Sequence, residues 1–247
     1  MKLHRFLLFI TFLIFLYSCS EDNDITTPRN LQEYLELNSY REPDNVIACA
    51  ANADQNLSLS YVFYYPIEGA TEVRYYEADS LNVDENNFSN YRRKNLTEVS
   101  VFGDKLSRFS RTDSEESWCI ITYLTEGKLH KSDPIRLKNA TSPTIWEDEV
   151  AINQSVTLSP KFTWSDFNIT DNDIYFQVIA NEDDDFISGT YTIDNYFQFY
   201  NTDNVVLNIT TTTPVDLILD ETYNFTLMAV SEDNWVNLVI QKSFVAE

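Results

Sequence analysis

Histidine is almost absent from the chain, which has only His4 and His130 among 247 residues. Metal sites built on imidazole, and Ser–His or Cys–His nucleophilic systems, need histidines with a pKa near neutrality. One histidine in the body of the chain is a poor basis for either. The sequence therefore predicts no catalytic residue of these kinds, no metal site and no cofactor, and His130 is interpreted as a surface strand residue.

Basic residues are also scarce. The chain has 17 Lys+Arg against 39 Asp+Glu, which gives a formal charge of −22. Nucleic acids and anionic membrane surfaces both attract positively charged proteins, so this balance argues against either as a direct partner. It fits a soluble surface protein whose copies repel one another, or a protein that binds cations.

Glycine and proline are few as well, at four and seven residues, whereas 16 Phe, 15 Tyr and 4 Trp are present. Aromatic content at this level argues against disorder. If residues 1–18 are cleaved off as a leader, the remaining chain has 229 residues, 15 Lys+Arg and a formal charge of −24. That length suits one large domain or two domains of roughly 100 residues.

The first two dozen residues form a separate unit. Lys2 and Arg5 give a short basic start, residues 6–17 follow as an unbroken apolar run, and Ser18 and Cys19 come directly after it. A helix that spans a bilayer needs about 20 apolar residues, so this run is too short for a permanent anchor. A basic start, a short apolar region and a small residue at its end are typical of a secretory signal peptide.

Residues 16–19, Leu-Tyr-Ser-Cys, resemble the lipobox of bacterial lipoproteins. The resemblance implies cleavage after Ser18 and a diacylglyceryl thioether on Cys19. Two acyl chains hold a protein firmly on a membrane without any transmembrane helix. The alternative is an ordinary cysteine at the end of a signal peptide that is cleaved elsewhere.

Residues 20–24, Ser-Glu-Asp-Asn-Asp, are similar to the acidic signal that carries lipoproteins of Bacteroidota to the outer face of the outer membrane. This resemblance implies a surface protein whose partner is the outer membrane, reached through the lipid on Cys19. If the acidic run is only a solvated tether, the protein faces the periplasm instead. Residues 19–45 are interpreted as an acidic tether, with room for a turn or two of helix near Leu31, Tyr34 and Leu35.

From residue 46 onward, short runs of Val, Ile, Tyr, Phe and Thr alternate with polar turn clusters, a pattern typical of β-strands. No amphipathic helix of ten or more residues is evident. The polar stretch 138–143 predicts a boundary between domains 46–139 and 140–247. Strands are expected at 46–50, 59–64, 72–78, 99–109, 118–124 and 129–137, and then at 149–152, 161–164, 174–180, 189–193, 196–199, 205–210, 222–230 and 236–244. The predicted fold class is all-β, with two sandwiches in tandem.

The second series resembles a fibronectin type III domain, an immunoglobulin-like β-sandwich. Residues 162–164 and 174–178 look like its strands B and C, with Trp164 in the core tryptophan position. Leu217 stands six residues before Tyr223, as in a tyrosine corner, and Phe225, Leu227 and Ala229 alternate after it. The resemblance implies that Leu217 fills the corner while the Tyr223 hydroxyl bonds to nearby backbone.

Residues 46–138 resemble the same fold more weakly. Trp118 stands where the corner tyrosine would be, and no tryptophan occupies strand B. If Trp118, Ile120 and Thr122 face the core, Cys119 faces outward, which argues against a disulfide with Cys49. The secretory route is oxidising, however, so the pair stays an open alternative.

Trp235 is the first candidate ligand-binding residue. It follows Ser-Glu-Asp-Asn in the turn between the last two strands, and such loops often carry recognition in this architecture. An exposed tryptophan beside Asp233 and Asn234 would stack on a sugar ring while its neighbours bond the hydroxyls. The alternative is that Trp235 folds back and covers the core.

Tyr196 and Tyr200 are the other two candidates. With Gln198 they share one face of a strand whose other face carries Phe197 and Phe199. If the phenylalanines are in the core, the tyrosines lie outside and would form a binding strip. Tyrosine is also common on the outer face of ordinary sheets.

Two further hypotheses rest on acidic residues alone. Residues 181–185, Asn-Glu-Asp-Asp-Asp, would suit calcium, which takes several carboxylate oxygens, but they match no specific loop and acidic runs are mostly solvated. Glycoside hydrolysis needs two carboxylates fixed about 5–10 Å apart in a cleft, and a sequence does not reveal such a pair. The chain is therefore predicted not to be an enzyme.

These observations favour a cell-surface lipoprotein that acts as a non-enzymatic binding or adhesion module for a glycan or a protein. The alternative is a structural spacer or an accessory subunit of an outer-membrane assembly, and a hydrolase is the third hypothesis. Fold resemblance alone does not choose among them.

Overall fold

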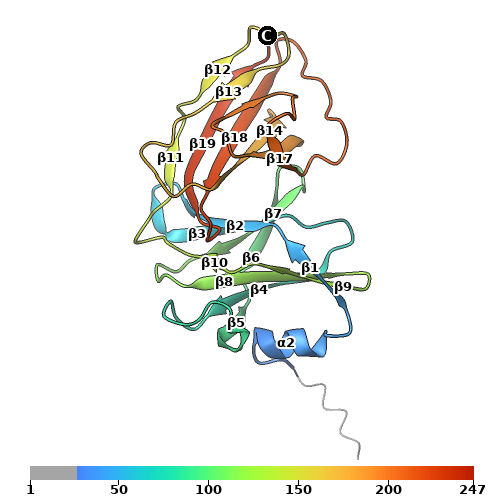
Figure 1. Ribbon diagram of the computed structural model, residues 1–247, viewed down its shortest axis with the longest axis vertical. Coiled ribbons are helices and arrows are strands. Elements are labelled where there is room, and N and C mark those ends of the chain that lie inside the picture. The colour runs from blue at the N-terminus through green and yellow to red at the C-terminus, as the bar shows by residue number, and fades with distance from the viewer. Residues whose placement is uncertain (1–26) are drawn as a thin grey trace, which may run out of the picture.

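The computed structural model describes residues 27–247, which fold into two β-sandwiches stacked along the long axis of the molecule (Figure 1). The lipobox, Cys19 and the acidic residues that follow it lie outside the described residues. None of the helices within 27–247 is long and apolar enough to cross a membrane.

The first sandwich consists of two sheets. Its outer sheet has the order β1-β9-β8-β4-β5, with the short β10 paired to β8, and its inner sheet has the order β2-β3-β7-β6. The strands are β1 (Glu42–Val46), β2 (Ala48–Ala53), β3 (Asn56–Tyr64), β4 (Thr71–Ala78), β5 (Tyr91–Lys94), β6 (Thr97–Val101), β7 (Leu106–Arg111), β8 (Trp118–Thr125), β9 (Lys128–Ser132) and β10 (Ile135–Arg136).

The second sandwich begins at β11. A large inner sheet, β11-β19-β18-β14-β15-β17, packs on a small outer sheet, β12-β13-β16. The strands are β11 (Ile145–Glu147), β12 (Ala151–Asn153), β13 (Lys161–Thr163), β14 (Ile174–Asn181), β15 (Phe186–Thr192), β16 (Tyr196–Gln198), β17 (Val205–Asn208), β18 (Thr222–Val230) and β19 (Val236–Val245). The all-β prediction of tandem immunoglobulin-like (fibronectin type III-like) sandwiches is confirmed.

The predicted tyrosine corner is present in the second domain. The Tyr223 hydroxyl accepts a hydrogen bond of 2.9 Å from the Ile218 backbone N–H, and Leu217 is buried. Trp164 lies in the same core, together with Phe225, Leu227 and Ala229. Every second residue of β18 from Phe225 to Ala229 therefore enters this core, as the alternation in the sequence predicts.

One predicted strand, at 99–109, is two strands in the structure. β6 and β7 pair as a hairpin whose turn places Phe102, Gly103 and Asp104 at φ of 52°, 57° and 64°. Glycine adopts this left-handed region readily, whereas Phe102 and Asp104 do so at some cost. The strand predicted at 99–109 therefore ran across Gly103-Asp104, a pair that favours a hairpin turn.

The N-terminal part of the described chain is folded, in contrast to the tether expected over residues 19–45. Helix α2 (Leu31–Leu37) begins at Asn30, whose side chain accepts from the Glu33 N–H at 2.9 Å. Leu31 and Tyr34 are buried against the outer sheet of the first domain. β1 then pairs in parallel with β9. The spacing of Leu31, Tyr34 and Leu35 correctly predicts a short helix. The sheet that this helix covers is evident only in the tertiary structure.

That helix reverses the expected orientation of β8. Cys119, Ile121 and Tyr123 face the interior of the sandwich, whereas Ile120 and Trp118 pack in the cluster that α2 covers. Trp118 is therefore not a substitute for the corner tyrosine, because its indole N–H donates to the Leu81 carbonyl at 3.3 Å on the other side of the sheet.

The two cysteines, Cys49 and Cys119, are free thiols and form no disulfide. Burial raises the pKa of the Cys49 thiol to about 12, and it raises the pKa of Cys119 as well. Because the thiolate is the reactive form, neither side chain is a nucleophile at neutral pH. The disulfide between Cys49 and Cys119, which the sequence left open, is therefore not formed.

His130 is buried and not on the surface. Its ring stacks on Tyr123 with 4.6 Å between centroids, and its Nε2 lies 2.8 Å from the Thr125 hydroxyl. The added parallel strand β1 covers β9, the strand on which His130 lies. The sequence gives no sign of this pairing, and His130 remains a packing residue.

Substitution of the helix cap tests whether α2 belongs to the domain. We expect Asn30→Ala to lower the free energy of unfolding by about 1 kcal/mol, because the Glu33 N–H loses its partner. Denaturant unfolding followed by circular dichroism measures the change. Gln32→Ala, at an exposed position of the same helix, is the control and should stay within roughly 0.5 kcal/mol of the parent. Equal midpoints for both variants would mean that α2 does not contribute to the cooperative fold.

Candidate functional site

Trp235, the first candidate from the sequence, is 0% exposed and lies in the core of the first domain. Its indole N–H donates to the Ser142 carbonyl at 2.8 Å. The Ala50 N–H donates to the Asn234 carbonyl at 3.0 Å, so the β18–β19 turn is bonded to β2. A sugar cannot stack on this ring, and the ligand-binding role predicted for Trp235 is corrected to a role in packing.

The prediction for Trp235 was wrong for a physical reason. The turn between β18 and β19 was expected at a free end of the second sandwich, but that end is the one that contacts the first domain. The indole enters the first core beside Val46, Ala50 and Ile135. A tryptophan in a turn has the same local sequence whether it meets water or another domain, so the sequence could not reveal that the first domain receives this indole.

Tyr196 and Tyr200 do not form a strip. Tyr196 is 37% exposed, and the Lys161 ammonium lies 4.3 Å from the centre of its ring. Tyr200 lies beyond the end of β16, half-buried against the core, and its hydroxyl accepts from Asn208 Nδ2 at 2.6 Å. Phe197 and Phe199 are buried as expected. The predicted alternation is confirmed for the phenylalanines, but the two tyrosines have separate environments.

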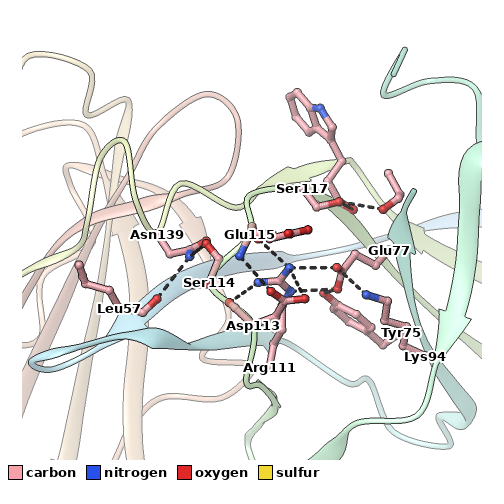
Figure 2. Close-up of polar contacts among 12 residues, drawn as sticks. Leu57, Tyr75, Glu77, Lys94, Arg111, Asp113, Ser114, Glu115, Ser117 and Asn139 are labelled. Atoms are coloured by element: carbon pink, nitrogen blue, oxygen red, sulfur yellow. Dashed lines mark hydrogen bonds and ion pairs between the residues drawn. The ribbon is translucent and has the colours of Figure 1, made fainter. Parts of the chain in front are cut away.

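A charge pair with both side chains buried lies in the first domain, between Glu77 on β4 and Arg111 on β7 (Figure 2). Arg111 Nε and Nη2 each donate to a different oxygen of Glu77 at 3.0 Å. The Tyr75 hydroxyl and the Lys94 ammonium donate to the same carboxylate at 2.9 and 2.7 Å. The two side chains of the pair are only 3% and 2% exposed.

This network leaves no group free for chemistry. Burial raises the pKa of Glu77, but the hydrogen bonds from Arg111 and Lys94 outweigh burial and hold the pKa below its usual value. Arg111 also donates to the backbone carbonyls of Asp113 and Glu115, which fixes the connection into β8. A carboxylate with three donors and a depressed pKa is a poor general acid or base. The Glu77–Arg111 pair is structural.

Two clefts open where the sandwiches meet. The larger, here named the acidic cleft, has a volume of about 720 Å³ and is lined by residues that include Trp118, Lys138, Asp173 and Glu232. Lys138 is held by Asp233 at 2.7 Å and lies 3.8 Å from Asp171. Carboxylates are the most frequent charged groups in this lining, and its basic residue, Lys138, is already paired with them.

The second opening, here named the Arg108 cleft, has a volume of about 500 Å³. Its lining combines buried apolar residues of both domains with charged and amide side chains. The lining residues are Phe63, Ser100, Val101, Phe102, Gly103, Asp104, Arg108, Trp146, Asp183, Asp184, Asp185, Thr226, Met228, Val239 and Gln241. An apolar floor with a few polar groups is the usual composition of a small-molecule site.

Arg108 distinguishes this cleft from the rest of the surface. Its guanidinium lies 3.9 Å from the centre of the Tyr61 ring, and its Nε is shielded from solvent without a hydrogen-bond partner. Within residues 27–247 no ion pair joins Arg108 to a carboxylate. Arg108 was not among the candidate residues that the sequence suggested. The pair Gly103-Asp104 is the sequence signal of a turn nearby.

The acidic loop at 181–185 forms one wall of this cleft. Asp185 accepts from Asn181 Nδ2 at 3.1 Å within the loop, and Asp184 accepts from Asn224 Nδ2 of β18 at 2.9 Å, so side-chain amides hold the loop. Within residues 27–247 no group of three or more His, Cys, Asp or Glu side chains is arranged to hold a metal ion. The loop is a solvated turn that presents carboxylates.

Comparisons with known proteins give a fold likeness only. No family model matches the chain, and no curated protein matches it. Among solved structures, it is similar to a two-domain fibronectin type III segment of chicken tenascin, with 14% identity, a TM-score of 0.27 and coverage of 83% of this chain and 99% of that one. The FN1–FN3 domains of chicken CNTN1 match with 9% identity, a TM-score of 0.27 and coverage of 84% and 68%.

A third similar structure is a laminaripentaose-producing β-1,3-glucanase of glycoside hydrolase family 64 from Paenibacillus barengoltzii. It has 10% identity and a TM-score of 0.26, and the match covers 77% of this chain and 50% of that one. Scores this low carry no argument about activity or ligand.

Proposed function

We propose that this protein is a non-enzymatic binding module, held on the outer membrane by a lipid on Cys19, whose ligand enters the Arg108 cleft. Immunoglobulin-like sandwiches commonly serve as binding or adhesion modules. The observation that carries the proposal is the cleft itself, which combines an arginine that forms no ion pair, and whose Nε has no hydrogen-bond partner, with an apolar floor contributed by both domains.

The junction supports a preformed site. Trp146 on β11 donates its indole N–H to the Asn52 carbonyl at 3.0 Å, and the Asn52 backbone N–H donates to the Thr144 hydroxyl at 2.8 Å. The apolar cluster between the domains joins Ala51 and Phe63 to Phe176 and Met228. With the domains fixed in this way, a ligand would not have to order them, which lowers the entropic cost of binding.

The absence of catalysis is part of the proposal. Glu77, the most buried acid with a depressed pKa, is saturated by donors and cannot transfer a proton to a substrate at neutral pH. Binding a ligand requires only a surface of complementary shape, and the cleft at the junction of the two domains is such a surface. A spacer without any ligand is the competing hypothesis, and ligand screening separates the two.

A cleft-filling substitution tests the site. We expect Gln241→Trp to abolish binding in an array of glycans and surface proteins, because Gln241 is exposed and lines the cleft. Val156→Trp, at a 52% exposed position away from the cleft, should bind as the parent does. Ligand capture that ignores Gln241→Trp would place the site elsewhere, and a stoichiometric partner captured without any cleft ligand would favour the spacer.

The lipid anchor has its own test. We expect mass spectrometry of the membrane fraction to show a diacylglyceryl group on Cys19 and no residues before it. Cys19→Ser should leave the protein with its leader uncut and the acyl group absent. An unmodified thiol at Cys19 in the wild-type protein would overturn the anchoring part of the proposal and leave the binding part intact.

A further inference from the structure

The chemistry of the Arg108 cleft narrows the class of ligand. Four carboxylates, those of Asp104, Asp183, Asp184 and Asp185, line it together with one guanidinium. An anionic ligand would gain Arg108 but meet four like charges, and a cationic ligand would gain the carboxylates but leave Arg108 without an acceptor. A neutral polyol uses both, because each hydroxyl donates to carboxylates and accepts from guanidinium N–H groups.

The two polar walls are held in fixed positions. A Cβ added to Gly103 would lie 2.9 Å from Asp185 Oδ1, so the β6–β7 turn and the β14–β15 turn already touch. Only glycine permits that approach together with a φ of +57°. Arg108 and Asp104 therefore line one preformed space from the first domain, and the carboxylates of residues 183–185 line it from the second.

The floor adds the apolar component. Phe63, Met228 and Val239 are buried, and Trp146 and Phe102 are half-buried in the same cleft. Trp146 is held in place by its bond to Asn52. Aromatic surface beside hydrogen-bonding groups matches the amphipathic faces of a sugar, whose C–H groups are apolar and whose hydroxyls point outward.

We propose that the Arg108 cleft binds a neutral oligosaccharide, with Arg108 donating to ring or hydroxyl oxygens and the carboxylates of residues 183–185 accepting from hydroxyls. This inference rests on the proposed function and names its ligand class. It predicts that the guanidinium fork acts through directed hydrogen bonds and not as a point charge.

The test uses the full processed protein and oligosaccharides of equal length. The neutral probes are cellohexaose, xylohexaose and mannohexaose, the anionic probe is hexagalacturonate and the cationic probe is a chitosan hexamer. Calorimetry should show binding of at least one neutral probe. Arg108→Met should weaken that binding by roughly tenfold or more, the loss expected for a hydrogen bond to a charged group. Arg108→Lys should not restore it.

Lys105→Met is the matched control, because it removes one positive charge from the same hairpin. Lys105 lies over the Tyr65 and Phe186 rings and does not line the cleft, so neutral-probe binding should persist. Unchanged melting temperatures would show that Arg108→Met acts on binding. Absence of binding by all neutral probes overturns the inference. Binding of only the charged probes, abolished by Gln241→Trp, overturns the ligand class while the proposed function stands.

Discussion

Replacement of Trp235 by alanine is expected to lower the free energy of unfolding by about 3–5 kcal/mol, the usual cost of removing a buried tryptophan. The indole is fully buried, and its hydrogen bond to Ser142 is lost together with its packing. Because the side chain belongs to the second domain and the cavity to the first, both sandwiches should be affected. Denaturant unfolding measures the loss of stability, and hydrogen exchange shows which sandwich it affects.

The distribution of the loss is the informative part. Exchange protection should fall in β8 of the first domain as well as in β18, on whose turn Trp235 stands. Val215→Ala, at a 69% exposed position of the second domain, is the control and should change stability by less than roughly 0.5 kcal/mol. A loss of protection confined to the second domain would show that the indole does not couple the two sandwiches.

The second large effect is expected at the Glu77–Arg111 pair. Arg111→Leu should cost about 3–5 kcal/mol, since it leaves a buried carboxylate without its main partner. Glu77→Leu with Arg111→Leu should cost less than the sum of the single variants, because the two side chains interact directly. Thermal or denaturant unfolding of all three variants gives the coupling.

The same pair predicts an acid-sensitive stability. The pKa of Glu77 is lower in the folded protein than its usual value of 4.5, so the folded state favours the charged form. The stabilisation is complete above the unfolded pKa and is lost as the pH falls below 4.5 through the folded pKa. Between pH 7 and pH 3, wild-type protein should therefore lose more stability than Glu77→Gln does.

An exposed ion pair provides the contrast. Lys242 and Asp148 are 3.5 Å apart, with side chains 41% and 81% exposed. Asp148→Asn should change stability by no more than about 1 kcal/mol, and salt should screen even that. If Asp148→Asn were as costly as Arg111→Leu, burial would not be the reason for the strength of the Glu77–Arg111 pair.

The sequence by itself determined the alternation of the strands. In the second domain the resemblance to a fibronectin type III domain implied the core position of Trp164 and the corner of Leu217 and Tyr223. The alternation itself placed Phe197 with Phe199, and Phe225 with Leu227 and Ala229, on shared faces of their strands. These features are local, because a period of two residues decides which side chains share a face of a strand. The same alternation and turn signals predicted the all-β class.

Only the tertiary structure decided what covers each face. Helix α2 covers the outer sheet, so Ile120 is buried there and Cys119 points into the sandwich. The first domain receives Trp235, and the approach of two distant turns makes the cleft around Arg108. Side-chain alternation specifies two faces of a strand but not their neighbours, because those are set by contacts between segments far apart in the chain.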